Sequence, residues 1–150
     1  MTDPFNGVGM RIQGMVHLSP RDAAPLIEAG ALLVDIRRPN YINGKRFGVV
    51  NLQYLPLAEL KKAWMNLPQD RLHILADNVG TSSKDAVSFL QEKGFTKVAN
   101  LIGGVLEWER DGFSTLVNDD ELLVGQCVCK LKPKGDLRKV RKSARRTQTD

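Results

Sequence analysis

The segment of this sequence with the clearest capacity for chemistry is a loop of six residues: Asp77, Asn78, Val79, Gly80, Thr81 and Ser82. It follows an apolar run at residues 72–76 and precedes an amphipathic run at residues 83–93, which predict a strand and a helix. Such a loop directs several backbone N–H groups into one small bowl, and the helix dipole adds partial positive charge there. Because aspartate accepts hydrogen bonds well at a helix start, we expect Asp77 to cap the helix and satisfy loop amides.

A sharper interpretation makes Asp77 a nucleophile toward a phosphate or an ester. That chemistry needs a cationic partner for the electrophile, and Lys84 is the only basic residue near the loop in the sequence. The shortage of positive charge disfavours this interpretation.

Cys127 and Cys129 are the two thiols of the chain. Residues two apart in a strand face the same side, so both sulfurs can meet one metal ion or one oxidant. Two ligands do not complete a zinc site, which needs four, and we therefore predict no metal site and no cofactor. Two alternatives stay open. The thiols are small buried hydrophobic groups on an edge strand, or they accept sulfur or act as a redox pair, with Lys130 and Lys132 favouring the thiolate.

The elements that must position these residues alternate between short β-type runs and amphipathic segments, which predicts a parallel sheet with crossover helices. The predicted strands are residues 15–18, 31–36, 48–55, 72–76 and 98–101, and the predicted helices are residues 20–30, 57–64, 83–93 and 104–108. Ser19, Pro20 and Asp22 predict a capped helix start, whereas Pro25 predicts that this helix is short or kinked. A further strand is possible at residues 122–128.

Asp35 and Arg37 follow the strand at residues 31–36, at the end where open α/β sheets bind ligands. A structural ion pair is the alternative role for them. His17 and His73 lie in or beside predicted strands without a carboxylate or thiol nearby in the sequence, so we interpret both as core or surface residues.

The charge of the chain is unevenly distributed. Residues 1–129 hold 13 Lys or Arg against 15 Asp or Glu, whereas residues 130–150 hold nine basic residues against two acidic ones. The basic segment from Lys130 to Arg146 could bind an anionic partner such as nucleic acid or an acidic protein surface, although it has no aromatic residue for stacking on bases. A solvated, disordered tail is the alternative.

The chain has two cysteines, no secretory-type start and no membrane-length apolar run, and we expect a cytoplasmic protein.

Four stretches, in this order, resemble the rhodanese-like domain family. The first is Leu-Val-Asp-Ile-Arg at the end of a strand (residues 33–37), and the second is a turn at residues 44–51 with Lys45 where the family usually has histidine. The third is the strand, loop and helix at residues 72–84, and the fourth is Leu-x-Gly-Gly-x-x-x-Trp-x-x-x-Gly-Phe at residues 101–113. A single Gly-Gly-x-x-x-Trp would be weak evidence, but four stretches at suitable intervals are specific.

The resemblance implies a loop of the form Cys-x-x-Gly-x-Arg, in which the helix field holds the cysteine as a thiolate that carries sulfane sulfur. Here Asp77 stands at the cysteine position and Ser82 at the arginine position, while Gly80 is kept. Because a carboxylate oxygen cannot form a persulfide, we expect no catalytic residue in this loop. It would instead be part of a pocket for a neutral or cationic group.

The expected fold is a three-layer α/β/α rhodanese-like domain with about five mostly parallel strands at residues 14–113. It is flanked by an N-terminal extension (1–13), a C-terminal extension (114–129) and the basic tail (130–150). The residues expected to bind a pocket ligand are Asp35, Arg37, Asp77, Gly80, Ser82 and Ser83. The expected function is a binding or regulatory module for an unknown protein or small molecule, without sulfurtransferase activity and without a membrane partner. The alternatives are a sulfur or redox carrier using Cys127 and Cys129, and an adaptor acting through the tail.

Overall fold

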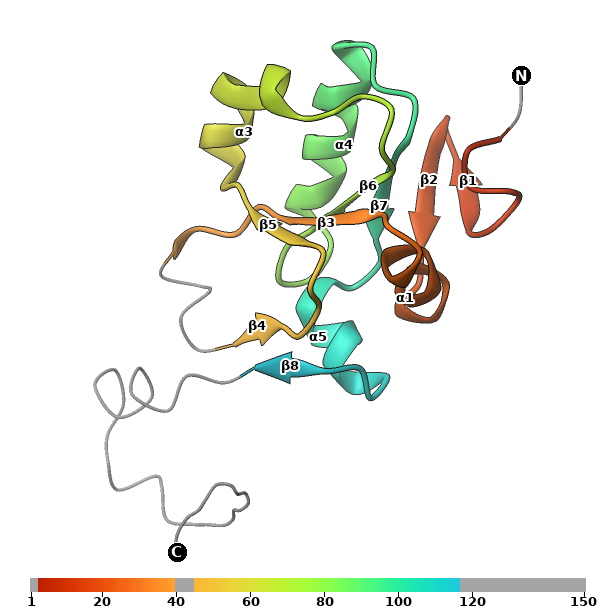
Figure 1. The fold of residues 1–150 in the computed structure, drawn as a ribbon, viewed down its shortest axis with the longest axis vertical. Helices are drawn as coiled ribbons and strands as arrows, with labels where there is room; N and C mark the ends of the chain where they lie inside the picture. Colours follow the sequence, from red (N-terminus) through yellow and green to blue (C-terminus); the bar gives the residue numbers. More distant parts are fainter. Residues whose placement is uncertain (1–2, 40–44, 117–150) are drawn as a thin grey trace, which may run out of the picture. The chain divides into compact units, whose positions relative to one another are not determined.

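The computed structural model describes residues 3–39 and 45–116 (Figure 1). Its strands are β1 (Met10–Ile12), β2 (Met15–Leu18), β3 (Leu32–Asp35), β4 (Arg46–Phe47), β5 (Leu52–Tyr54), β6 (His73–Ala76), β7 (Val98–Leu101) and β8 (Thr115–Leu116). Its helices are α1 (Pro20–Glu28), α3 (Leu57–Ala63), the 3₁₀ turn η1 (Trp64–Asn66), α4 (Ser82–Glu92) and α5 (Gly104–Arg110). No helix in this described part is long and apolar enough to cross a bilayer.

Six strands form the central sheet, in the order β1-β2-β7-β6-β3-β5. The β1–β2 hairpin is antiparallel, and every other pairing in this sheet is parallel. The expected α/β class with a mostly parallel sheet is therefore confirmed. The parallel strands all end at the same edge of the sheet, and this edge is where the loop at residues 77–81 lies.

Two apolar cores lie on opposite faces of the sheet. Helices α1 and α5 contribute to one core with Ala23, Ile27 and Trp108, whereas α3 and α4 contribute to the other with Leu60 and Leu90. The two pairs of helices cover opposite sides of the strands in Figure 1. Consecutive residues of a strand point to opposite faces, so each buried strand supplies both cores and reads as a continuous apolar run.

The start of α1 follows the sequence prediction. The Ser19 side chain accepts a hydrogen bond from the Asp22 amide, and the Asp22 carboxylate accepts one from the Ser19 amide. Pro25 lies inside this helix, which is nine residues long and ends before Gly30. A short first helix was therefore correctly predicted.

Several residues outside the expected domain take part in it. The segment expected as an N-terminal extension supplies β1 to the central sheet, and its Phe5 is fully buried in one of the cores. After Phe113, β8 pairs with β4 in a separate two-stranded sheet. The possible strand at residues 122–128 and the basic tail lie outside the described residues.

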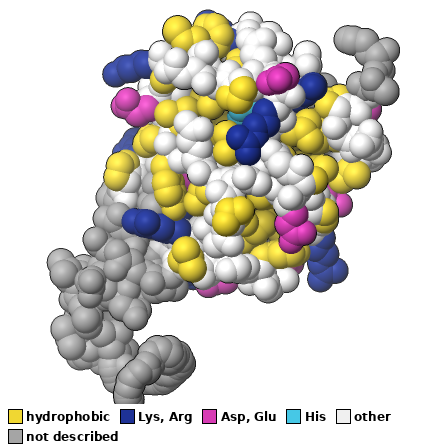
Figure 2. All heavy atoms as spheres, viewed as in Figure 1, with side chains coloured by type: hydrophobic (Ala, Val, Ile, Leu, Met, Phe, Trp, Pro, Cys, Tyr) yellow, Lys and Arg dark blue, Asp and Glu magenta, His cyan; other side chains and the backbone are white. Residues whose placement is uncertain are grey.

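The surface of the described domain carries charges of both signs. In the view of Figure 2, Lys and Arg side chains are interspersed with Asp and Glu rather than gathered in one patch. This mixture agrees with the nearly balanced charge of residues 1–129.

Candidate functional site

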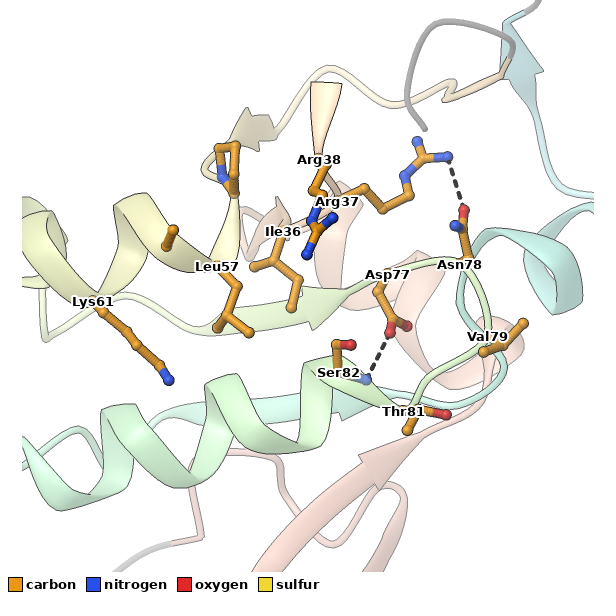
Figure 3. Close-up of a pocket in the computed structure, with 12 residues that line it drawn as sticks. Ile36, Arg37, Arg38, Leu57, Lys61, Asp77, Asn78, Val79, Thr81 and Ser82 are labelled. Atoms are coloured by element: carbon orange, nitrogen blue, oxygen red, sulfur yellow. Dashed lines mark hydrogen bonds between the residues drawn. The ribbon is translucent and has the colours of Figure 1, made fainter. Parts of the chain in front are cut away.

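The loop at residues 77–81 is organised by the carboxylate of Asp77, whose residue is only 7% exposed. Its Oδ2 accepts a hydrogen bond from the Ser82 amide at 2.7 Å (Figure 3). Its Oδ1 accepts one from the Gly80 amide. Thr81, at the N-cap position of α4, makes no side-chain capping bond. Asp77 therefore caps this helix from five residues upstream, which confirms that its carboxylate satisfies loop amides.

The carbonyl groups of the same loop are held by the start of α5. The Val105 amide donates to the Asp77 carbonyl at 2.9 Å, and the Leu106 amide donates to the Asn78 carbonyl at 3.2 Å. This contact is close because Gly104 has no side chain, since a Cβ there would lie 2.3 Å from the Asp77 carbonyl oxygen. The Gly-Gly-x-x-x-Trp stretch thus holds the loop in place through contacts with the Asp77 and Asn78 carbonyl groups.

Gly80 is constrained in a similar way. Its φ of +93° lies in the left-handed region, and a Cβ there would come within 2.8 Å of the Gly103 amide nitrogen. The chain can follow this path around the Asp77 carboxylate only where residue 80 has no side chain.

Asp35 and Arg37 form a buried ion pair behind the loop. The Arg37 Nη2 atom lies 2.7 Å from Asp35 Oδ2, and the side chains are 2% and 0% exposed. The guanidinium also donates to the Lys45 carbonyl at 2.9 Å and to Asn78 Oδ1 at 3.4 Å. Arg37 therefore connects the end of β3 with two neighbouring loops, in agreement with the structural alternative for this pair.

A pocket of about 640 Å³ opens beside the loop, where β3, β5 and β6 end. Figure 3 shows its lining, which comes from loop residues, from the segment after β3 and from α3. Ile36 and Leu57 give it apolar walls, and Arg38 and Lys61 add positive charge. Lys84 is the only basic residue near the loop in the sequence, but in space Arg38 and Lys61 also bring positive charge to the pocket beside it. Residues distant in the sequence reach the pocket because parallel strands end together.

The residues expected to bind a pocket ligand are divided between different places. Arg37, Asp77 and Ser82 line the pocket, together with Asn78, Val79 and Thr81 from the same loop. Asp35 and Ser83 are fully buried, and neither is among the residues that line it. Gly80 instead lines a second pocket on the other side of the loop. Ligand binding by any of them stays a prediction.

Ser83 belongs to a buried polar chain that sequence reasoning missed. Its hydroxyl donates to Asn100 Oδ1, and Asn100 Nδ2 donates to His17 Nδ1 at 3.1 Å. Burial, together with the nearby Lys84 ammonium, lowers the pKa of His17 below its ordinary value. The three partners are far apart in the sequence, and only the parallel pairing of His17 with Asn100 brings them together.

The remaining candidates cannot be compared with this site. Cys127, Cys129 and the segment from Lys130 to Arg146 lie outside the described residues. Within residues 3–39 and 45–116, no group of three or more His, Cys, Asp or Glu side chains is arranged to hold a metal ion.

Comparisons with known proteins agree with this architecture. The family model of the rhodanese-like domain matches residues 19–111. A sulfurtransferase of Allochromatium vinosum is 32% identical over 81 residues, which cover 54% of this chain and 74% of that protein. The thiosulfate sulfurtransferase GlpE of Pseudomonas fluorescens is 34% identical over 93 residues, which cover 61% of this chain and 83% of that protein. A solved rhodanese-related protein from Thermoplasma volcanium superimposes with a TM-score of 0.60 at 24% identity, covering 68% of this chain and 98% of the other.

Proposed function

The chain belongs to the rhodanese-like domain family, and we propose that it is a binding or regulatory module that has lost thiosulfate and sulfane sulfurtransferase activity. The observation that carries this proposal is the position of the Asp77 carboxylate, which accepts the Gly80 and Ser82 amides inside the loop. The resemblance described above places the family's nucleophilic cysteine at this position.

Three physical reasons support the loss of activity. A carboxylate oxygen does not form a persulfide, so Asp77 cannot carry sulfane sulfur. Its oxygens also use the Gly80 and Ser82 amides that a substrate anion would need, and its negative charge repels that anion. Finally, Ser82 brings no positive charge to the loop.

The pocket is nevertheless well suited to binding. Its volume lies within the range of about 300–1,000 Å³ that is usual for small-molecule sites, and it combines apolar walls with a few polar groups. Beside Asp77 it favours a neutral hydrogen-bond donor, because the carboxylate keeps acceptor capacity. Arg38 and Lys61 disfavour the cationic alternative. The ligand is a protein segment or a small molecule with a neutral group that reaches the loop.

The test measures sulfur transfer from thiosulfate to cyanide by four forms of the full chain. They are the unmodified protein, Cys127→Ser/Cys129→Ser, Asp77→Cys in that thiol-free background, and the same variant with Ser82→Arg added. We expect no activity from the unmodified protein or from Cys127→Ser/Cys129→Ser. We expect activity from the variant that carries both Asp77→Cys and Ser82→Arg if the loop still has the geometry of the family. Turnover by Cys127→Ser/Cys129→Ser would contradict the proposal, because that variant has no thiol.

The two alternative functions give different results. A sulfur carrier acting through Cys127 or Cys129 would gain a mass of about 32 Da, one sulfur atom, on either thiol after exposure to a sulfane donor. An adaptor acting through the tail would bind nucleic acid or an acidic protein with strong salt dependence, and it would lose this binding on deletion of residues 130–150.

A further inference from the structure

A second pocket lies on the other side of the loop, between the β1–β2 hairpin and the start of α4. Met10 pairs with His17, and Ile12 pairs with Met15, so these four side chains share one face of the hairpin. Helix α4 packs on β6 and β7 and leaves this face partly uncovered. The pocket has a volume of about 260 Å³, and Met10 and Ile12 in its lining are 55% and 50% exposed.

Among the described residues, one side-chain hydrogen bond joins the hairpin to α4, at one end of this pocket. The Gln91 side chain, in the last turns of α4, donates to the Gly14 carbonyl at 3.0 Å. Lys84 is seven residues earlier, two helical turns along the same side of the helix, and it lines the pocket. The start of α4 is therefore the open end, and it carries the positive end of the helix dipole.

His17 supplies a polar group to the floor of this pocket. It lines the pocket although it is only 8% exposed. The Ser83 hydroxyl donates to Asn100 Oδ1, and with the Asn100 amide in this orientation its Nδ2 group donates to His17 Nδ1. The neutral ring must then carry its proton on Nε2, and no described residue accepts a hydrogen bond from that atom. A fixed N–H donor is thus left for a ligand.

Lys84 completes the polar end of the pocket. Among the described residues, no carboxylate forms an ion pair with it. Asp77 lines only the first pocket, and its oxygens are engaged by the Gly80 and Ser82 amides. One ammonium and one neutral donor suit a single negative charge better than a phosphate dianion. The apolar side chains beside them suit a hydrocarbon group.

We propose that this second pocket binds a small amphipathic monocarboxylate, with its carboxylate on His17 Nε2 and Lys84 and its hydrocarbon part over Met10, Ile12 and Val79. The volume lies just below the usual range of about 300–1,000 Å³ for ligand pockets, so the ligand is smaller than a typical drug-sized molecule. This site is separate from the pocket of the proposed function, although Val79 and Thr81 line both.

The test titrates the full chain with hexanoate, hexanamide and acetate and follows backbone amide shifts by NMR. We expect hexanoate to shift residues around Ile12, Lys84 and Ile102, and both other probes to bind more weakly. Hexanamide lacks the charge, and acetate lacks the hydrocarbon chain. The proposal is overturned if hexanamide binds as tightly as hexanoate, if the shifts centre on Leu57 and Lys61, or if hexanoate causes no shift up to its solubility limit.

Three exposed positions provide variants that do not disturb the core. Lys84→Gln should weaken hexanoate binding roughly fivefold or more, because a charge-assisted hydrogen bond is lost. Lys62→Gln removes the same charge from α3, lines neither pocket and should change the affinity less than about twofold. Met10→Ser should reduce the preference for hexanoate over acetate. If Lys84→Gln and Lys62→Gln weaken hexanoate binding equally, the change in affinity reflects only the net charge of the protein, and the proposed site is contradicted.

Discussion

The Asp77 carboxylate and the Ser82 amide are joined by a 2.7 Å hydrogen bond across the turn that begins α4. The same carboxylate accepts the Gly80 amide, so one side chain determines the path of the loop. Because both acceptors belong to a residue that is 7% exposed, water cannot easily replace them. The Asp77 carboxylate, on which the proposed loss of sulfur transfer rests, therefore also stabilises the loop.

Replacing Asp77 should consequently destabilise the fold. Asp77→Ala leaves the buried Gly80 amide and the Ser82 amide without acceptors, and we expect the free energy of unfolding to fall by roughly 2 kcal/mol. Asp85→Ala is the matched control, because Asp85 is exposed in the first turn of the same helix. It should cost about 0.5 kcal/mol. Urea denaturation measures both values, and similar losses would mean that Asp77 acts only through the helix dipole.

Gly104 allows a second prediction about the support of the loop. Gly104→Ala would place a Cβ 2.3 Å from the Asp77 carbonyl oxygen and would also pay for a φ of +59°. At Gly112, with a φ of +88°, a Cβ meets nothing within 4 Å. We expect Gly112→Ala to cost about 1 kcal/mol from backbone strain alone, and Gly104→Ala to cost at least about 2 kcal/mol more.

Thermal and urea unfolding of both variants distinguish close approach from conformational strain. Amide shifts at Asn78 and Val79 should move in Gly104→Ala and stay unchanged in Gly112→Ala. Equal losses of stability would show that the backbone conformation matters at Gly104 and the contact with Asp77 does not.

The strand and helix order was predictable because its signals are local. The start of α1 is indicated within four residues, by Ser19, Pro20 and Asp22. The run at residues 31–36 is predominantly apolar because this strand supplies both cores. The capping role of Asp77 was predictable for the same reason, since its partners Gly80 and Ser82 are three and five residues away. Strand β1 was missed because Met10–Ile12 is short and exposed, without buried alternation.

The lining of the two pockets was less predictable because it depends on strand order. Lys61 reaches the first pocket only because β5 lies beside β3, and His17 meets Asn100 only because β2 lies beside β7. The carboxyl ends of predicted parallel strands were the available signal for Arg38 and Leu57, since both follow such ends. No local sequence pattern predicts the hydrogen bonds that link Ser83, Asn100 and His17.

His73 gives the protein a predictable loss of stability in acid. It is fully buried on β6, its Nδ1 group donates to the Arg71 carbonyl at 2.8 Å, and its Nε2 atom has no hydrogen-bond partner among the described residues. Burial is the main cause that lowers the pKa of His73 below the ordinary value of 6.5. Protonation would place a charged N–H group where no acceptor lies.

The direction of the pH effect follows from proton binding. As the pH falls through 6.5, the unfolded chain binds a proton on this histidine while the folded chain stays neutral. The contribution of neutral His73 to the free energy of unfolding is therefore complete above pH 6.5. It is lost as the pH falls below this value, by up to about 1.4 kcal/mol per pH unit for each such histidine. The lowered pKa of His17 adds to the loss in the same direction.

His73→Phe should remove one of these two contributions. The ring can keep its edge-on contact with Phe95, and loss of the Arg71 hydrogen bond is offset by removal of the unpartnered nitrogen, so we expect a change within about 1 kcal/mol at pH 8. Between about pH 5 and pH 6.5, the slope of unfolding free energy against pH should fall to roughly half that of the unmodified protein. Phe95→Leu is the control, because it removes the ring contact and keeps the histidine, so its slope should match the unmodified protein. An unchanged slope in His73→Phe would place the acid sensitivity in His17 or in the carboxylates.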